Sequence, residues 1–211
     1  MASARDAYHH GDLRNALVAS AVRLIEQGGA ATFSLREAAR GVGVSANAAY
    51  RHFDDKSALM AAVAAEGFQQ LGKRMQRAMT RASEAGDSRA SIARFKAVGR
   101  AYVEFAADHP ELFRLMFGER GVECLRQVTA DPAVETPWTL LGKALDALAS
   151  DGLLTPERRQ GAELKAWTVV HGFASLALDG LVVFRKGGER AAALEALLAF
   201  AVVGLCSAPS T

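Results

Sequence analysis

The chain has 211 residues, of which 50% are hydrophobic, 23% are charged and only five are proline. This length and composition allow one large domain or two small ones around a sizeable core, and they exclude a disordered chain. The net charge of +2 is too small to indicate a nucleic-acid partner by itself, so a basic surface would depend on where cations are placed. Alanine and leucine abound while β-branched runs are short, which predicts an all-α fold of about nine helices.

The cysteines and the N-terminal residues give information on the cellular compartment of the chain. Cys124 and Cys206 lie far apart in the sequence and form no CxxC pair. The first residues, with Arg5 and Asp6, lack the apolar core of a signal peptide. We therefore expect a reduced, cytoplasmic chain. The longest apolar run, residues 196–206, is too short to span a bilayer.

The first expected helix follows a short N-terminal segment. Residues 1–9 are polar, and we expect them to form a loose arm. Apolar residues then recur at helical spacing from about residue 11, and the pair Gly28 and Gly29 stops the pattern. This helix is expected to pack against the two that follow it.

Residues 34–53 predict two short helices joined by a tight turn. Ser34 and Glu37 fit a capping box at the start of the first helix. The glycine-containing turn at residues 41–43 ends that helix, because glycine reaches positive φ without strain. Ser45 can then cap the second helix. Such a helix-turn-helix can place its second helix in the major groove of DNA.

The rest of the chain predicts further helices and a division into two domains. Asp54 and Asp55 offer an N-cap for a long connecting helix that starts near Lys56. We expect an N-terminal helix-turn-helix domain at residues 1–60 and a C-terminal helical domain at residues 61–211. The remaining helices are expected at about residues 91–108, 110–118, 137–150, 156–179 and 189–206, two of them opened by a threonine–proline pair.

Three stretches of the N-terminal quarter carry a family resemblance, namely LVASAVRLIEQGG (17–29), FSLREAARGVGVS (33–45) and AAYRHFDDKSAL (48–59). They resemble the tetracycline-repressor (TetR) family of bacterial transcriptional regulators. The most specific signature of the family is a tyrosine, histidine, phenylalanine and lysine pattern, here Tyr50, His52, Phe53 and Lys56. The chain departs from the family at Phe33, where threonine is common, and at residues 47–49. These departures concern the base preference and not the fold.

A weaker resemblance covers two downstream segments. AYVEFAADHPELFRLMFG (101–118) and AWTVVHGFASLALDG (166–180) are similar to a C-terminal domain of the family named for its Trp–His–Gly (WHG) pattern, here Trp167, His171 and Gly172. This resemblance implies ligand binding and dimerisation. We therefore interpret the chain as a homodimeric, non-enzymatic regulator, most often a repressor in this family, that binds a palindromic operator and needs no cofactor or metal.

The candidate DNA contacts lie in and around the second helix of the motif. Asn47 could pair bidentately with an adenine, whereas Tyr50, His52 and Lys56 carry donors suited to phosphates. The alternative is that Ser45 only caps its helix and that the other polar side chains are solvated. The full candidate set is Arg36, Ser45, Ala46, Asn47, Tyr50, Arg51, His52 and Lys56.

The candidate ligand contacts are aromatic and apolar residues of the C-terminal domain, which suggest a small apolar or aromatic effector. They could equally form ordinary core, and a histidine on an apolar face is more often a core residue than a ligand contact. The set is Tyr102, Phe105, Phe113, Met116, Phe117, Trp167, His171 and Phe173.

The last two helices, about residues 156–179 and 189–206, are apolar around much of their circumference, and this predicts a homodimer interface. Two rival interpretations come from other protein classes. One is a helical enzyme acting on a hydrophobic substrate, although no acid–base pair, phosphate loop or metal-ligand spacing stands out. The other is a helical adaptor whose motif packs instead of binding DNA.

Overall fold

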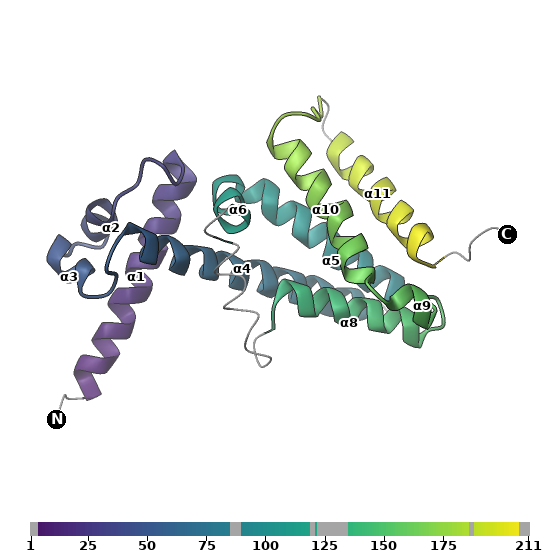
Figure 1. Cartoon of the computed structure of the whole chain (residues 1–211), viewed down its shortest axis with the longest axis horizontal. Helices are drawn as coiled ribbons and strands as arrows, with labels where there is room; N and C mark the ends of the chain where they lie inside the picture. The colour runs from purple at the N-terminus through teal and green to yellow at the C-terminus, as the bar shows by residue number, and fades with distance from the viewer. Residues whose placement is uncertain (1–3, 85–89, 119–120, 122–134, 186–187, 207–211) are drawn as a thin grey trace. The chain divides into compact units, whose positions relative to one another are not determined.

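The computed structural model describes residues 4–84, 90–118, 121, 135–185 and 188–206, and within these ranges the chain is all-helical (Figure 1). The all-α prediction is confirmed, with ten helices and no strand in the described part. Two compact units are present. The first takes its described residues from 1–69 and 109–134, and the second from 70–108 and 135–211.

The first unit is built from five helical segments. They are α1 (Ala4–Gly28), α2 (Leu35–Gly41), α3 (Ala46–Tyr50), the start of α4 (Lys56–Glu84) and α6 (Pro110–Phe117). Helix α1 packs against α2 and α6, and α2 packs against α3. Their shared core consists of fully buried apolar side chains, namely Leu17, Ala21, Ile25, Leu35, Ala38, Ala39, Ala49, Phe53, Leu59 and Val63.

Helix α1 begins earlier than the sequence pattern predicts. The expected loose arm at residues 1–9 is wrong from Ala4 onward, because the backbone is already helical there. The segment contains no proline, and its single Gly11 costs only about 1 kcal/mol relative to alanine, which does not stop a helix that continues on both sides. The end of the helix is as predicted, with Gly28 as its last residue and Gly29 at φ 78°.

The second unit is organised around α5 (Ala90–Asp108), which packs against α8 (Pro137–Ser150), α10 (Ala162–Leu178) and α11 (Glu189–Cys206). Gly99 of α5 permits this close approach. A Cβ atom at Gly99 would lie 2.6 Å from Leu198 Cδ2 of α11 and 3.3 Å from Val170 Cγ1 of α10. A larger residue there would force the Leu198 side chain to move and would crowd Val170.

The expected continuous helix at residues 156–179 is wrong, since the chain forms a short α9 (Pro156–Arg159) and then α10. Gly161, at φ 68°, makes the break. Arg159 stabilises this corner, with Nε 2.8 Å from Asp146 Oδ1 of α8 and Nη1 2.6 Å from Glu163 Oε1 of α10. The two carboxylates come from different helices, so the break depends on tertiary contacts as well as on glycine.

The packing of α6 bears on the domain division. Helix α6 belongs to the same compact unit as α1, α2 and α3, although it follows α5 in the chain. Helix α4 contributes residues up to Gln69 to the first unit and later residues to the second. The division at residue 60 stays a prediction from the sequence.

The remaining expectations concern the two cysteines and a membrane-spanning segment. Cys206 has a free thiol at the end of α11, and burial raises its pKa. Cys124 lies outside the described residues. Within the described ranges, every helix is too short or too polar to cross a membrane.

Candidate nucleic-acid interface and effector site

Two serines cap the helices of the motif as predicted, but the full capping box at Ser34 is not formed, because the Glu37 carboxylate accepts from the Ser34 hydroxyl and not from the Ser34 backbone N–H. Ser34 Oγ accepts from Glu37 N at 3.2 Å at the start of α2, and its hydroxyl donates to Glu37 Oε2 at 2.9 Å. Ser45 Oγ accepts from Ala48 N at 3.2 Å at the start of α3. Gly43, at φ 74°, forms the turn between them.

The motif divides its side chains between core and surface. Ala49 and Phe53 are buried and belong to the core of the first unit. The opposite side of α3 is open, and the Asn47 amide makes no hydrogen bond with any described residue. The exposed candidates are Arg36, Ser45, Asn47, Tyr50 and Arg51, while Ala46, His52 and Lys56 are half-exposed.

Lys56 has partners inside the protein that sequence reasoning missed. Its Nζ donates to the Ala31 carbonyl at 3.1 Å and lies 4.9 Å from the centroid of the Phe33 ring. Phe33, the residue that departs from the family pattern, is buried and supplies an aromatic face to this cation. The aromatic residue at position 33 was thus the feature of the sequence that could have indicated an internal partner for Lys56. Lys56 links the start of α4 to the loop before α2.

Arg14 of α1 is a second cation that the candidate set lacks. Its Cζ atom lies 5.0 Å from the centroid of the Phe53 ring, which follows α3. This contact places a positive charge of α1 beside the end of the motif. It could not be found from spacing along the chain, since 39 positions separate the two residues.

In the second unit, Tyr102 joins two of the candidate ligand contacts. Trp167 Nε1 donates to the Tyr102 hydroxyl at 3.1 Å, and that hydroxyl lies 2.8 Å from His171 Nδ1. Burial raises the pKa of Tyr102 and lowers the pKa of His171. A neutral imidazole whose Nδ1 accepts a hydrogen bond from the Tyr102 hydroxyl satisfies both observations, and its ring hydrogen then lies on Nε2.

Aromatic rings extend this polar group. The Trp167 ring centroid lies 5.3 Å from that of His171 and 6.0 Å from that of the exposed Trp138, which meets it edge-on. Phe173 instead pairs with Phe184 at 5.7 Å. Tyr102, Trp167 and His171 thus form one cluster, and their role in ligand binding stays a prediction.

The other candidate ligand contacts lie elsewhere. Phe113, Met116 and Phe117 belong to α6 and thus to the first unit, and Phe117 packs edge-on against Phe68 with centroids 5.4 Å apart. Met116 is fully buried. Phe105 is buried in the second unit. The structure therefore places the predicted ligand set in two separate groups.

The buried imidazole predicts a pH dependence of stability. Because the pKa of His171 in the folded protein lies below its ordinary value of 6.5, the unfolded chain binds more protons between these two values. The free energy of unfolding should be highest above pH 6.5 and should fall as the pH drops below it. Urea unfolding of the wild type and of His171→Gln between about pH 5 and 8 would measure this. An unchanged pH slope in the variant would contradict it.

Protein-family comparisons match both parts of the chain. Residues 17–63 match the family described as bacterial regulatory proteins, tetR family, and residues 95–201 match the tetracyclin repressor-like C-terminal domain. No curated protein matches the chain.

Solved structures resemble the chain over nearly its whole length. A protein of unknown function from Rhodococcus sp. RHA1 is 32% identical with a TM-score of 0.72, covering 95% of this chain and 98% of its own. The fatty acid degradation regulator FadR from Bacillus halodurans is 14% identical with a TM-score of 0.67, covering 91% and 95%. RolR, in complex with resorcinol, is 16% identical with a TM-score of 0.64, covering 97% and 98%. At 14% and 16% identity, the last two similarities support a shared fold and nothing more.

Proposed function

The chain belongs to the TetR family of bacterial transcriptional regulators, and we propose that it acts in the cytoplasm as a homodimeric, ligand-responsive repressor. Members of this family bind DNA and are transcription factors rather than enzymes. The observation that carries the proposal is the motif surface, where Ser45 and Asn47 at the start of α3 are exposed while Ala49 anchors the helix.

The proposed DNA contacts fall into two groups. Arg36 and the start of α3, residues 45–47, would face base edges, because N-terminal residues of a recognition helix reach them. Tyr50, Arg51, His52 and Lys56 would contact phosphates, which position the protein without reading sequence. A two-fold dimer would present two such surfaces to a palindromic site.

Operator binding is the direct test of the proposed function. A gel-shift assay with the DNA flanking the protein's own gene should detect a complex that resists unrelated competitor DNA and weakens steeply with salt. Equal affinity for all duplexes would instead support the adaptor interpretation, in which the motif only packs.

Asn47→Ala should change the preference among operator variants. A bidentate pair with adenine contributes about 1–3 kcal/mol of discrimination, so loss of the amide should bring the variants closer in affinity. Quantitative gel shifts with single-base operator variants would measure the ranking. An unaltered ranking would remove Asn47 from the base contacts.

Lys56→Ala should weaken binding to all sequences by a similar factor. A lost phosphate contact lowers the slope of log K against log salt by about one unit. Binding measured over a range of salt would reveal this change. A lower thermal stability with an unchanged slope would assign Lys56 to its internal contacts with Ala31 and Phe33 alone.

The proposed dimer interface lies on α10 and α11. These helices pack together and expose large apolar side chains, namely Leu164, Leu176, Phe200 and Val203. Apart from its own helix backbone, a Cβ atom at Gly172 or Gly204 would meet no atom of the described residues within 4 Å, so a second copy could approach closely there. Apolar surface of this extent is typical of protein–protein contact.

The proposed effector is a small apolar or aromatic molecule bound near Tyr102, Trp167 and His171. Phe105 and Phe173 of the same unit complete the proposed set, whereas Phe113, Met116 and Phe117 of α6 belong to the first unit and stay a prediction from the sequence. The effector would act by binding better to one arrangement of the dimer than to another, because only differential affinity shifts operator occupancy. Resorcinol, the ligand in the RolR complex, is the first compound to titrate against Trp167 fluorescence in a Trp138→Phe variant.

A further inference from the structure

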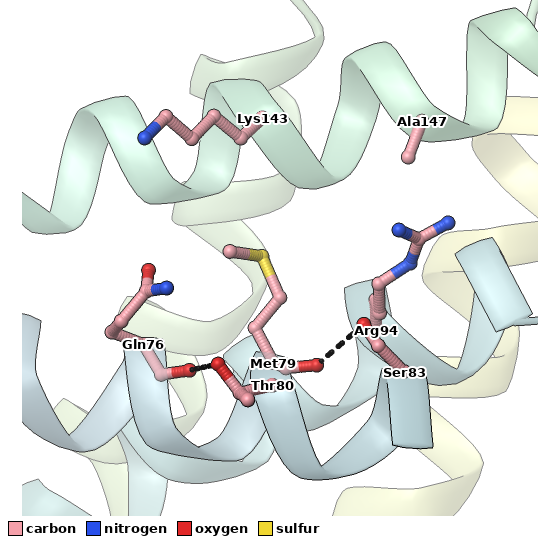
Figure 2. Close-up of a pocket in the computed structure, with 7 residues that line it drawn as sticks. All are labelled: Gln76, Met79, Thr80, Ser83, Arg94, Lys143 and Ala147. Atoms are coloured by element: carbon pink, nitrogen blue, oxygen red, sulfur yellow. Dashed lines mark hydrogen bonds between the residues drawn. The ribbon is translucent and has the colours of Figure 1, made fainter. Parts of the chain in front are cut away.

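A cavity of about 390 Å³ lies within the second unit, between α4, α5 and α8. Figure 2 shows Gln76, Met79 and Arg94 directed toward the side of α8 that carries Lys143 and Ala147. The volume falls in the range of about 300–1,000 Å³ that is typical of small-molecule sites. None of these five residues belongs to the ligand set expected from the sequence.

The charged side chains among the described residues that line this cavity, Arg94 and Lys143, are both positive. Arg94 Nε donates to the Ala90 carbonyl at 3.3 Å, and its guanidinium forms no ion pair with any described residue. Lys143 pairs with Glu135 but remains more than half exposed. No acidic residue is found among the described residues that line the cavity. A guanidinium in this state offers donors in the planar arrangement that matches a carboxylate.

One acceptor in the cavity wall lacks a partner. Gln76 Oε1 is buried and has no hydrogen-bond donor among the described residues. The nearby hydroxyls are already used, since Thr80 Oγ1 donates to the Gln76 carbonyl at 3.1 Å and Ser83 Oγ donates to the Met79 carbonyl at 3.0 Å (Figure 2). A buried acceptor without a partner is costly, and a ligand hydroxyl would satisfy it.

We propose that this cavity binds a small organic carboxylate that also carries a hydroxyl group. The carboxylate lies against Arg94 and Lys143, the hydroxyl donates to Gln76 Oε1, and the carbon skeleton packs between Met79 and Ala147. This site is distinct from the aromatic cluster at Tyr102, and its binding chemistry does not depend on the proposed repressor function.

The test uses the full chain and the three hydroxybenzoate isomers as probes. Calorimetric titration should show saturable binding of at least one isomer, and the corresponding hydroxybenzyl alcohol, which lacks the carboxylate, should bind about tenfold more weakly or worse. Arg94→Gln should lower the affinity by a similar factor. Arg77→Gln is the matched control, because Arg77 is an exposed arginine of α4 that is not among the described lining residues, and it should leave the affinity unchanged.

Three results would overturn the proposal. They are the absence of saturable binding up to roughly 10 mM of every isomer, equal affinity for acid and alcohol, and equal weakening by Arg94→Gln and Arg77→Gln. If circular dichroism shows that Arg94→Gln does not fold, Lys143→Met replaces it. Chemical-shift changes at the Ala147 amide then report binding in the wild type. Operator binding is measured separately by gel shift, so failure of either proposal can be told from failure of the other.

Discussion

Phe200→Glu and Val203→Glu are expected to convert the protein into monomers that no longer hold operator DNA. Phe200 is 66% exposed and Val203 is 60% exposed on α11, so neither substitution disturbs the core of its own unit. An obligate interface buries on the order of 2,000 Å² or more and resembles a domain core. A buried glutamate would be desolvated there without a partner, which such an interface does not tolerate.

The loss of DNA binding should be large even though α11 contributes nothing to the motif. Two linked heads gain a factor of about 10²–10⁴ over one head, so a monomer should bind operator at least about a hundredfold more weakly. Sedimentation equilibrium and gel shifts on the same samples would measure both effects. A wild-type protein that is monomeric at micromolar concentration would contradict both the proposed interface and the proposed binding of operator by two motif surfaces.

The choice of position and control matters for this experiment. Leu197 and Val202 of α11 are half-buried, so a charge there could unfold the unit and imitate a broken interface. Leu153→Glu is a suitable control, because Leu153 is an exposed leucine between α8 and α9. It should stay dimeric and bind operator normally.

Phe53→Ala is expected to unfold the first unit and thereby abolish DNA binding. The Phe53 side chain is 3% exposed, and Arg14 lies over its ring. Truncation of a buried phenylalanine costs about 3–5 kcal/mol, a large part of the roughly 5–15 kcal/mol that stabilises a typical domain. Helix α3 is only five residues long, so it has little intrinsic stability without this anchor.

The two units allow this effect to be located. Both tryptophans of the chain, Trp138 and Trp167, belong to the second unit, so their fluorescence during urea unfolding reports that unit, whereas circular dichroism reports both. Phe53→Ala should shift the circular dichroism transition to lower urea, and Phe53→Leu should shift it much less. An unchanged transition in Phe53→Ala would show that the ring does not anchor the motif.

Local signals explain why several helix starts and ends could be predicted. Ser34, Ser45 and Thr136 cap their helices through backbone N–H groups three residues ahead. Pro110 opens α6 where it was expected. Such contacts depend only on residues within one turn, so the sequence carries them completely.

Two helix boundaries required more than local sequence. Helix α1 continues back to Ala4 through Gly11, because glycine in a helix interior is a modest cost rather than a stop signal. The break at Gly161 joins a left-handed residue to the Arg159 contacts with α8 and α10. Hydrophobic periodicity along the sequence gives no information on contacts between residues that are distant in the chain.

The helical class, the family and the motif could be predicted from the amino-acid order, because periodicity, capping and a short signature are properties of neighbouring residues. The contacts of the side chains depend on the tertiary structure. It joined Lys56 to Phe33, gathered Tyr102, Trp167 and His171, and placed α6 with the N-terminal helices. It also left Arg94 without an ion-pair partner among the described residues at the edge of a cavity. Burial and charge pairing arise between segments far apart in the chain, and one sequence does not state which segments meet.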